Sequence, residues 1–241
     1  MNTFFFYVIR RFALFYCVTL LELKASLNDS KNFLGDWTES VEFPCKWTGI
    51  TCSQQEQKVI SINLPYMQFA GTLSPTIAKL DKLQRLGLHQ NKLHGIIPAE
   101  ISQCSELRAL YLRANNFEGG IPSTMGNLTH LRILDLSSNL LKGAIPSSLV
   151  RLRNLTHLNL SSNFLSGEIP NIGALARFGF TSFIGNSDLC GLQVNKPCQT
   201  SLGFPAVLPH VASDEEIAAL ATTLFSKCSI ALSPDGISPF F

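Results

Sequence analysis

The stretch LQRLGLHQNKLHGIIP, residues 83–98, decides the fold, because its spacing returns at one constant interval through the middle of the chain. The same pattern of Leu, Asn, Gly and Ile-Pro occupies residues 107–122, 131–146 and 155–170, and a weaker copy covers residues 59–73. Self-similarity at a fixed period of this length is typical of a solenoid, in which each repeat is one coil of a stack. A solenoid usually works through an extended surface rather than an enclosed pocket.

The Leu-x-Leu pair inside each repeat predicts a short strand whose side chains point alternately to opposite faces. Leu86 and Leu88 are therefore expected in the core, whereas Gly87 and His89 face outward. Each fully buried Leu contributes about 1.5–3 kcal/mol, and one repeat can bury its apolar face only against its neighbours. The sequence predicts an α/β repeat fold, namely a right-handed leucine-rich-repeat solenoid of about five 24-residue repeats with a cap at each end.

Two further series recur with the same period and have structural explanations. A polar side chain inside the stack is tolerated only if it is hydrogen-bonded, so the repeated asparagines are expected to bond the backbone of adjacent coils. The repeated glycines mark tight turns, and the Ile-Pro after each glycine begins the convex side. The two series are Asn91, Asn115, Asn139 and Asn163, and Gly95, Gly119, Gly143 and Gly167.

The composition favours a compact binding module over an enzyme. Hydrophobic residues make up 46% of the 241 residues and charged residues 15%, and the net charge of +2 gives no reason to expect a nucleic-acid partner. No histidine pair has metal-ligand spacing, and the sequence places no Ser or Cys nucleophile beside a histidine. We therefore expect no catalytic residue, no metal and no cofactor.

The cysteines lie where the two ends of the solenoid need covering. Cys45 and Cys52 precede the first repeat, and Cys190 and Cys198 follow the last one. Each pair closes a short loop, which predicts a local disulfide and hence an oxidising compartment. Zinc is the alternative for four cysteines, but stacked strands about 4.8 Å apart separate the pairs by roughly 20 Å. Cys104 lies within the repeats and is expected to be a buried thiol.

Three motifs together resemble the ectodomain of plant leucine-rich-repeat receptor-like kinases. These are the repeated Asn-x-Leu-x-Gly-x-Ile-Pro pattern, the segment WTGITC at residues 47–52 and the segment FIGNSDLCG at residues 183–191. Within that family the small ectodomains of the FEI-type group are the most similar, and the resemblance covers about residues 20–210. It implies a secreted, glycosylated recognition module that meets a peptide ligand, a co-receptor ectodomain or both.

Both ends of the chain depart from that family. A basic and then apolar start predicts a signal peptide, although no small-residue cleavage site follows it, and a mis-assembled start is the alternative. The longest late apolar run, residues 217–225, is too short to cross a bilayer, and no kinase motif is present. The predicted divisions are a signal peptide at 1–21, an N-terminal cap at 22–58, five repeats at 59–178, a C-terminal cap at 179–198, and a mostly disordered tail at 199–241 with a short helix at 214–226.

Function is expected at the outward positions of the strands. The period places them in three columns across the coils, which contain a cluster of Arg, His, Tyr and Asp side chains. Tyr and Arg are favoured at binding hot spots, and Arg can bind a carboxylate with two hydrogen bonds. Solvated surface with mutual charge pairing is the alternative interpretation. The predicted contact residues are Arg85, His89, Tyr111, Arg113, Asp135 and His157.

Four asparagines fit the acceptor pattern for N-glycosylation, Asn28, Asn127, Asn154 and Asn159. Asn159 is expected to point out of the concave face, where a sugar would block that end of the surface. The leading hypothesis is an extracellular, secreted or cell-surface recognition module that acts in plant signalling as a soluble or truncated receptor-like kinase. The alternatives are a repeat-type inhibitor of a secreted cell-wall hydrolase and a non-functional truncated product.

Overall fold

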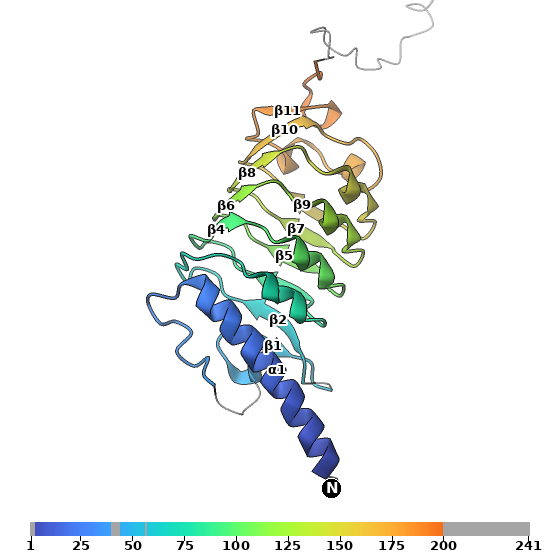
Figure 1. Ribbon diagram of the computed structural model, residues 1–241. Coiled ribbons are helices and arrows are strands. Elements are labelled where there is room, and N and C mark those ends of the chain that lie inside the picture. Colours follow the sequence, from blue (N-terminus) through green and yellow to red (C-terminus); the bar gives the residue numbers. More distant parts are fainter. Residues whose placement is uncertain (1–2, 40–43, 56, 200–241) are drawn as a thin grey trace, which may run out of the picture. The chain divides into compact units, whose positions relative to one another are not determined.

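The structure is a computed structural model that describes residues 3–39, 44–55 and 57–199. The described residues up to Cys198 form one compact unit of stacked coils (Figure 1). The predicted tail helix at residues 214–226 lies outside the described residues, as does the rest of the tail beyond Gln199.

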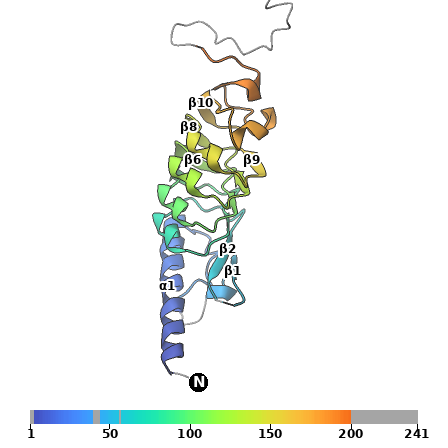
Figure 2. The same ribbon diagram turned by 90° about the vertical axis from the view of Figure 1, so that its right-hand side faces the viewer.

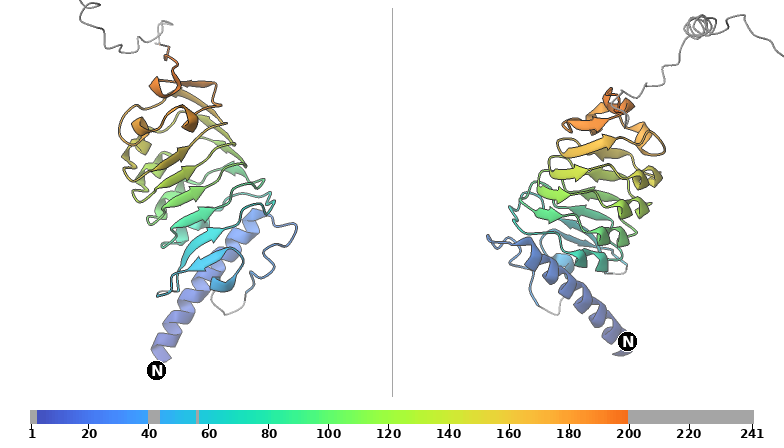
Figure 3. Two further views of the ribbon diagram at one scale, coloured as in Figure 1. Left: turned by 180° about the vertical axis from the view of Figure 1, so that it is seen from behind. Right: turned by 45° about the horizontal axis from the view of Figure 1, so that its top comes forward.

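The Leu-x-Leu segments form one sheet, seen from behind in Figure 3. Its first two strands are antiparallel, and the others follow in parallel with each repeat paired to the next. We call its outward side the concave face. Leu86 and Leu88 are fully buried as expected, whereas Gly87, which was expected to face outward, is also buried. In order the strands are β1 (Ile50–Cys52), β2 (Val59–Asn63), β3 (Arg85–Gly87), β5 (Ala109–Tyr111), β7 (Ile133–Asp135) and β9 (His157–Asn159).

The other side of each coil carries a second parallel sheet and then a 3-10 turn. The sheet contains β4 (His94–Ile96), β6 (Asn116–Gly119), β8 (Leu140–Gly143), β10 (Phe164–Glu168) and β11 (Asp188–Cys190). The turns of the repeats are η2 (Pro75–Lys79), η3 (Ala99–Gln103), η4 (Ser123–Asn127) and η5 (Ser147–Arg151). Each is only five residues long, too short for a stable α-helix. The predicted leucine-rich-repeat solenoid is confirmed.

The buried asparagines hold neighbouring coils together, as expected. The side-chain amide of Asn139 donates to the carbonyl oxygens of Leu112, Leu136 and Ser137 at 3.0, 3.0 and 3.2 Å, and its oxygen accepts from the Phe117 N–H at 3.1 Å. Asn91, Asn115 and Asn163 repeat these contacts in the other coils. Each amide therefore satisfies buried backbone groups of two coils.

A fifth asparagine extends the series into the C-terminal cap. Asn186 accepts from the Leu165 N–H at 3.0 Å and donates to the carbonyl oxygens of Leu160 and Phe183. It comes one position earlier after Asn163 than the constant period requires, so the period alone did not predict its role. The predicted C-terminal disulfide, Cys190–Cys198, closes the end of this coil beside the short turn η8 (Leu192–Val194).

The N-terminal cap contains the helix α1 (Thr3–Leu27), which lies against the first coils in Figures 1 and 2. Its side chains Leu20, Leu23 and Leu27 are buried, and the Tyr16 hydroxyl donates to Asp81 at 2.7 Å. Within the described part of the chain, none of the helices combines the length and the apolar character that crossing a bilayer requires.

The rest of this cap is built around paired tryptophans and the predicted disulfide. The rings of Trp37 and Trp47 stack with centroids 5.6 Å apart, and the Trp37 indole donates to the Thr48 carbonyl at 3.0 Å. Cys45, in the turn η1 (Pro44–Lys46), is bonded to Cys52 in β1. Both predicted disulfides are therefore present, and Cys104 is a buried thiol as expected.

The predicted signal peptide, residues 1–21, overlaps this packed helix. Tyr16, Cys17 and Leu20 are almost completely buried, although they precede the predicted boundary at residue 22. Their burial follows from the helical period, because residues 16, 20, 23 and 27 share one apolar face. The cap in this structure thus begins at least six residues before that boundary, since 22 minus 16 is six.

Asn139→Ala is expected to lower the free energy of unfolding by about 2–4 kcal/mol, because it leaves buried backbone groups without partners. Asn116→Ala is the matched control, since Asn116 is exposed on β6, and a change within about 0.5 kcal/mol is expected there. Denaturant unfolding of both variants measures the difference. Equal midpoints would contradict the structural role of the buried asparagines.

Leu20→Ala is expected to destabilise the cap by about 2–5 kcal/mol, as other Leu truncations in a core do. Val18→Ala, on the exposed side of α1, is expected to change stability by less than about 0.5 kcal/mol. Thermal unfolding of the secreted protein gives the comparison. If neither substitution shifts the midpoint, the part of α1 before residue 22 is not in the mature cap and the predicted cleavage after residue 21 stands.

Candidate functional site

The strand register brings the outward side chains of neighbouring repeats into columns. Arg85 pairs with Ala109, which pairs with Ile133 and then His157 in the next two coils. In the second column Tyr111 pairs with Asp135, and Asp135 with Asn159. The predicted columns are therefore present, because every coil of the repeats has the same length.

An aromatic row crosses the early coils. The His89 ring lies between Tyr66 and Tyr111, with centroid distances of 5.8 and 6.0 Å. Tyr66 is largely exposed, whereas His89 and Tyr111 are half-buried. Tyr66 lies in the turn that follows β2 and has a positive φ of 61°, a geometry that the sequence interpretation did not include. The row offers flat apolar surface with polar tips, as aromatic side chains at interfaces do.

A charged pair stands beside this row. Arg113 Nε lies 3.8 Å from Asp135 Oδ2, and the other Asp135 oxygen accepts from the Ser137 hydroxyl at 2.6 Å and the Ser137 N–H at 3.1 Å. The carboxylate is thus oriented by its own coil, whereas 42% of the Arg113 side chain remains accessible. The mutual charge pairing of the alternative interpretation exists, and Arg113 still has exposed donors for a further anion.

His89 is held mainly in its neutral form. Burial lowers its pKa, the nearby Arg113 charge lowers it further, and Asp135 acts weakly in the opposite direction. Its Nδ1 atom is buried and has no hydrogen-bond partner among the described residues. The unfolded chain therefore binds a proton more readily, so the contribution of neutral His89 to stability is complete above its usual pKa of 6.5 and declines as the pH falls below that value.

A cavity of about 520 Å³ opens at the C-terminal end of the concave face. Its volume lies within the usual range of ligand pockets, roughly 300–1,000 Å³. Its lining combines the polar side chains of Asp135, His157 and Asn159 with the apolar side chains of Ile133 and Phe178. The lining also includes Tyr111, Leu134, Thr156, Leu158 and Ser182.

The structure connects five of the six predicted contact residues and leaves one apart. Tyr111, Asp135 and His157 line the cavity, and Arg113 joins them through Asp135. His89 reaches the group through Tyr111. Arg85 is exposed at the start of β3, and among the described residues no hydrogen bond or ion pair joins its side chain to this group.

The C-terminal cap supplies two cavity residues that sequence reasoning missed. Because Asn186 comes one position early, Ser182 occupies the place of Asn159 in a sixth coil, and the Leu160 N–H donates to its carbonyl at 2.8 Å. Phe178 precedes it, between η6 (Leu175–Arg177) and η7 (Phe180–Ser182), and also lines the cavity. Continuing the asparagine series with a slightly shorter last coil could have found both residues.

The predicted glycosylation acceptors occupy different surfaces. Asn28, Asn127 and Asn154 are exposed outside the concave face, and Asn127 accepts from Arg151 at 3.1 Å. Asn159 lines the cavity and accepts from the Ser161 N–H at 3.1 Å. A sugar on Asn159 and a ligand in the cavity would therefore exclude each other.

Family models match three parts of the chain. Residues 18–53 match the leucine rich repeat N-terminal domain, and residues 82–104, 106–128 and 121–165 match leucine rich repeats. The N-terminal match begins inside α1, before the boundary predicted at residue 22.

The curated relatives are plant receptor kinases, which the chain matches over a short segment. One leucine-rich repeat receptor-like serine/threonine-protein kinase of Arabidopsis thaliana is 46% identical over 79 residues, 33% of this chain and 7% of the kinase. FEI 2, another such kinase from the same plant, is 44% identical over 75 residues, 31% of this chain and 13% of FEI 2. The chain thus spans a small part of these relatives.

Two solved ectodomain structures are covered almost completely, and a third is covered over about a quarter of its length. A chain of the Arabidopsis BIR3–SERK2 complex is 39% identical with a TM-score of 0.68, covering 74% of this chain and 96% of that one. The Arabidopsis BIR2 ectodomain is 33% identical with a TM-score of 0.70, covering 75% and 96%. A chain of the Arabidopsis complex of HAESA with the peptide hormone IDA and the co-receptor SERK1 is 34% identical, with a TM-score of 0.60, covering 64% and 26%. This ectodomain fold is a non-catalytic binding fold.

Arg113→Gln is expected to raise the pKa of His89, because it removes a positive charge that disfavours protonation. Asp135→Asn is expected to lower the same pKa, which makes the pair of variants an internal control. Titration of the His89 ring protons by NMR measures both shifts. Shifts of the same sign in the two variants would contradict the electrostatic coupling described above.

Proposed function

Because the chain belongs to the family of plant leucine-rich-repeat receptor-kinase ectodomains, we propose that its concave face binds an extended peptide or a partner ectodomain. The observation that carries this proposal is the cavity of about 520 Å³ between the last repeats and the C-terminal cap. It joins an apolar part to polar groups in the one region where most of the predicted contact residues meet. Such a combination suits one anchoring side chain of a partner.

The rest of the concave face would bind the partner on either side of that anchor. The row of Tyr66, His89 and Tyr111 gives flat aromatic contacts, which cost little conformational entropy on binding. The free donors of Arg113 would bind a carboxylate of the ligand without breaking the bond to Asp135. Five coils about 4.8 Å apart span roughly 20 Å, enough for about six extended residues, so a short epitope fits.

The related complexes support both kinds of partner. One contains BIR3 with SERK2, and another contains HAESA with the peptide hormone IDA and the co-receptor SERK1. We propose that this chain acts outside the plant cell, for which its two disulfides are suited. A soluble or truncated form remains a separate prediction, and sequencing the 3′ end of the native transcript tests it.

Ile133→Glu is expected to weaken partner binding at least roughly tenfold, because it places a charge in the apolar part of the cavity. Ile96→Glu is the matched control, since Ile96 is exposed on β4 outside the concave face, and it should leave binding unchanged. Surface plasmon resonance with a panel of plant co-receptor ectodomains and secreted peptides measures both. The protein carries Asn159→Gln in each case, so that no sugar fills the cavity.

Unchanged binding by Ile133→Glu, with a partner that the parent protein binds, would contradict the cavity as the anchoring site. A panel that yields no partner, together with inhibition of a secreted polygalacturonase by the purified chain, would favour the hydrolase-inhibitor hypothesis instead. Circular dichroism of all variants ensures that a loss of binding does not reflect unfolding.

A further inference from the structure

A second surface lies where the strands of the concave sheet begin, beside the 3-10 turns. One residue of each coil forms a column there: Ile60, Gln84, Arg108, Arg132 and Thr156. Each N–H donates to the carbonyl of the residue before it in the column, at 2.8 Å in all four steps. Neighbouring side chains therefore stand one coil apart, about 4.8 Å. We call this column and its surroundings the flank.

A second column runs along the flank and is fixed by side-chain hydrogen bonds. His130 Nδ1 lies 3.1 Å from the Ser105 carbonyl, and the Asn154 amide donates to the Thr129 carbonyl at 2.8 Å. One coil later Arg177 donates to the Arg153 carbonyl at 3.1 Å. The same position holds Lys82 and Glu106 in the earlier coils.

The flank is rich in arginines that lack counter-ions. The exposed side chains of Arg108, Arg132, Arg151, Arg153 and Arg177 form no ion pair with any residue that the structure describes. By contrast, Lys79 on the convex side and Arg113 on the concave face each have a carboxylate partner. Glu106 is the one carboxylate in the two columns. Five arginines without an ion-pair partner among the described residues thus lie on this one surface, in a chain whose net charge is only +2.

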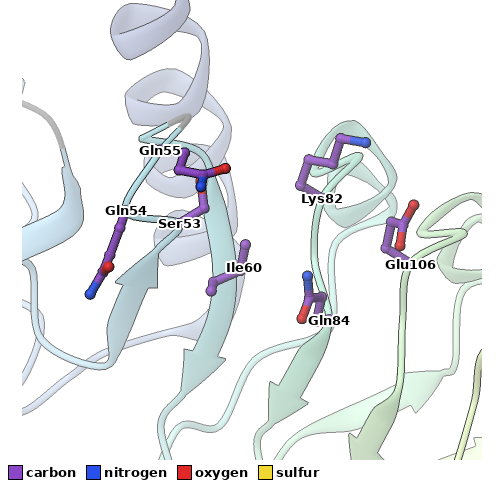
Figure 4. A pocket seen from close by; sticks show the side chains of 7 residues that line it. All are labelled: Ser53, Gln54, Gln55, Ile60, Lys82, Gln84 and Glu106. Carbon is purple, nitrogen blue, oxygen red and sulfur yellow. The ribbon is translucent and has the colours of Figure 1, made fainter.

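The N-terminal end of the flank contains a polar cavity of about 470 Å³ (Figure 4). Ser53, Gln54 and Gln55 stand on one side of Ile60, and Lys82, Gln84 and Glu106 on the other. Ile60 and Gln84 are also the first two members of the column that continues with Arg108 and Arg132, so the cavity and these arginines form one continuous surface.

We propose that this flank binds a linear acidic polysaccharide, a polyuronate. Side-chain amides and hydroxyls can both donate and accept, so they match the hydroxyl groups of a sugar placed over Ile60. The guanidinium groups of Arg108 and Arg132 can each bind a carboxylate with two hydrogen bonds. Arg108 and Arg132 stand on neighbouring coils about 4.8 Å apart, which suits a polymer that presents an anionic group on successive units.

An extended acidic peptide fits this surface less well. Peptides commonly bind by adding a strand to an open sheet edge, which needs free backbone N–H and C=O groups. Along the flank column these groups already bond one coil to the next. The flank also shares no lining residue with the concave cavity apart from Thr156, the last member of the column, so this proposal stands independently of the partner-binding function.

The test measures how tightly the full secreted chain binds polygalacturonate. The chain is first treated to remove N-linked sugars, because the predicted acceptor Asn154 lies on the flank. The parent protein should bind the acidic polymer, and binding should weaken as salt is raised, because the contacts are exposed ion pairs. Fully methyl-esterified polygalacturonate, which lacks the charges, should bind at least roughly fivefold more weakly. Equal binding of the two polymers would overturn the proposal.

Arg108→Gln combined with Arg132→Gln should weaken binding of polygalacturonate by roughly five- to tenfold, since two exposed ion pairs are lost. Gln84→Ala should also weaken it, through lost hydrogen bonds in the cavity. Lys92→Gln with Lys142→Gln is the matched control, because it removes the same charge from the second sheet, just before β4 and within β8. Circular dichroism melting checks that each variant is folded.

Two other results would overturn the assignment. An equal loss in the Lys92 and Lys142 control would show that the polymer responds only to the net charge of the protein. In the other result, poly-L-glutamate binds as tightly as polygalacturonate and loses that binding in the variant with Arg108→Gln and Arg132→Gln. This result would assign the flank to acidic peptides instead.

Discussion

The hydrogen bonds of the buried asparagines are the constraint on which the rest of this structure depends. Each amide bonds backbone groups of its own coil and of the coil before it, as Asn139 does with Leu136 and Leu112. A buried amide is stable only with all these partners in place, so neighbouring coils cannot slide past one another, and even the shorter last coil keeps the bonds through Asn186. The strands, turns and surface columns follow from that fixed stacking.

Because the stacking is fixed, side chains at the same position of successive coils are aligned on the surface. On the concave face it aligns Tyr111 with Asp135 and Asn159, and at the flank it aligns Arg108 with Arg132. The two faces nevertheless differ in character. The concave face joins aromatic rings to one charged pair and ends in a partly apolar cavity, whereas the flank carries guanidinium groups without counter-ions among the described residues, beside a polar cavity. One scaffold therefore offers two chemically distinct binding surfaces.

The two caps cover the ends of the stacked repeats, and the C-terminal cap also contributes residues to the concave face. At one end α1 covers the first coil, with Tyr16 bonded to Asp81. At the other end the sixth coil, shorter than the repeats, brings Phe178 and Ser182 to the concave face. Repeats alone would present a uniform surface. The irregular C-terminal cap adds the residues that, together with the last strand of the concave face, line the cavity.

The sequence by itself determined the coil length, the buried leucines and asparagines, both disulfides and the columns on the concave face, because these depend on spacing along the chain and on local backbone geometry. Only the tertiary structure separated Arg85 from the group around Tyr111, packed Leu20 beneath the predicted cleavage boundary and added Phe178 to the cavity. Periodicity specifies which residues share a column, whereas the direction of a side chain and the packing of an irregular cap depend on contacts between residues far apart in the chain.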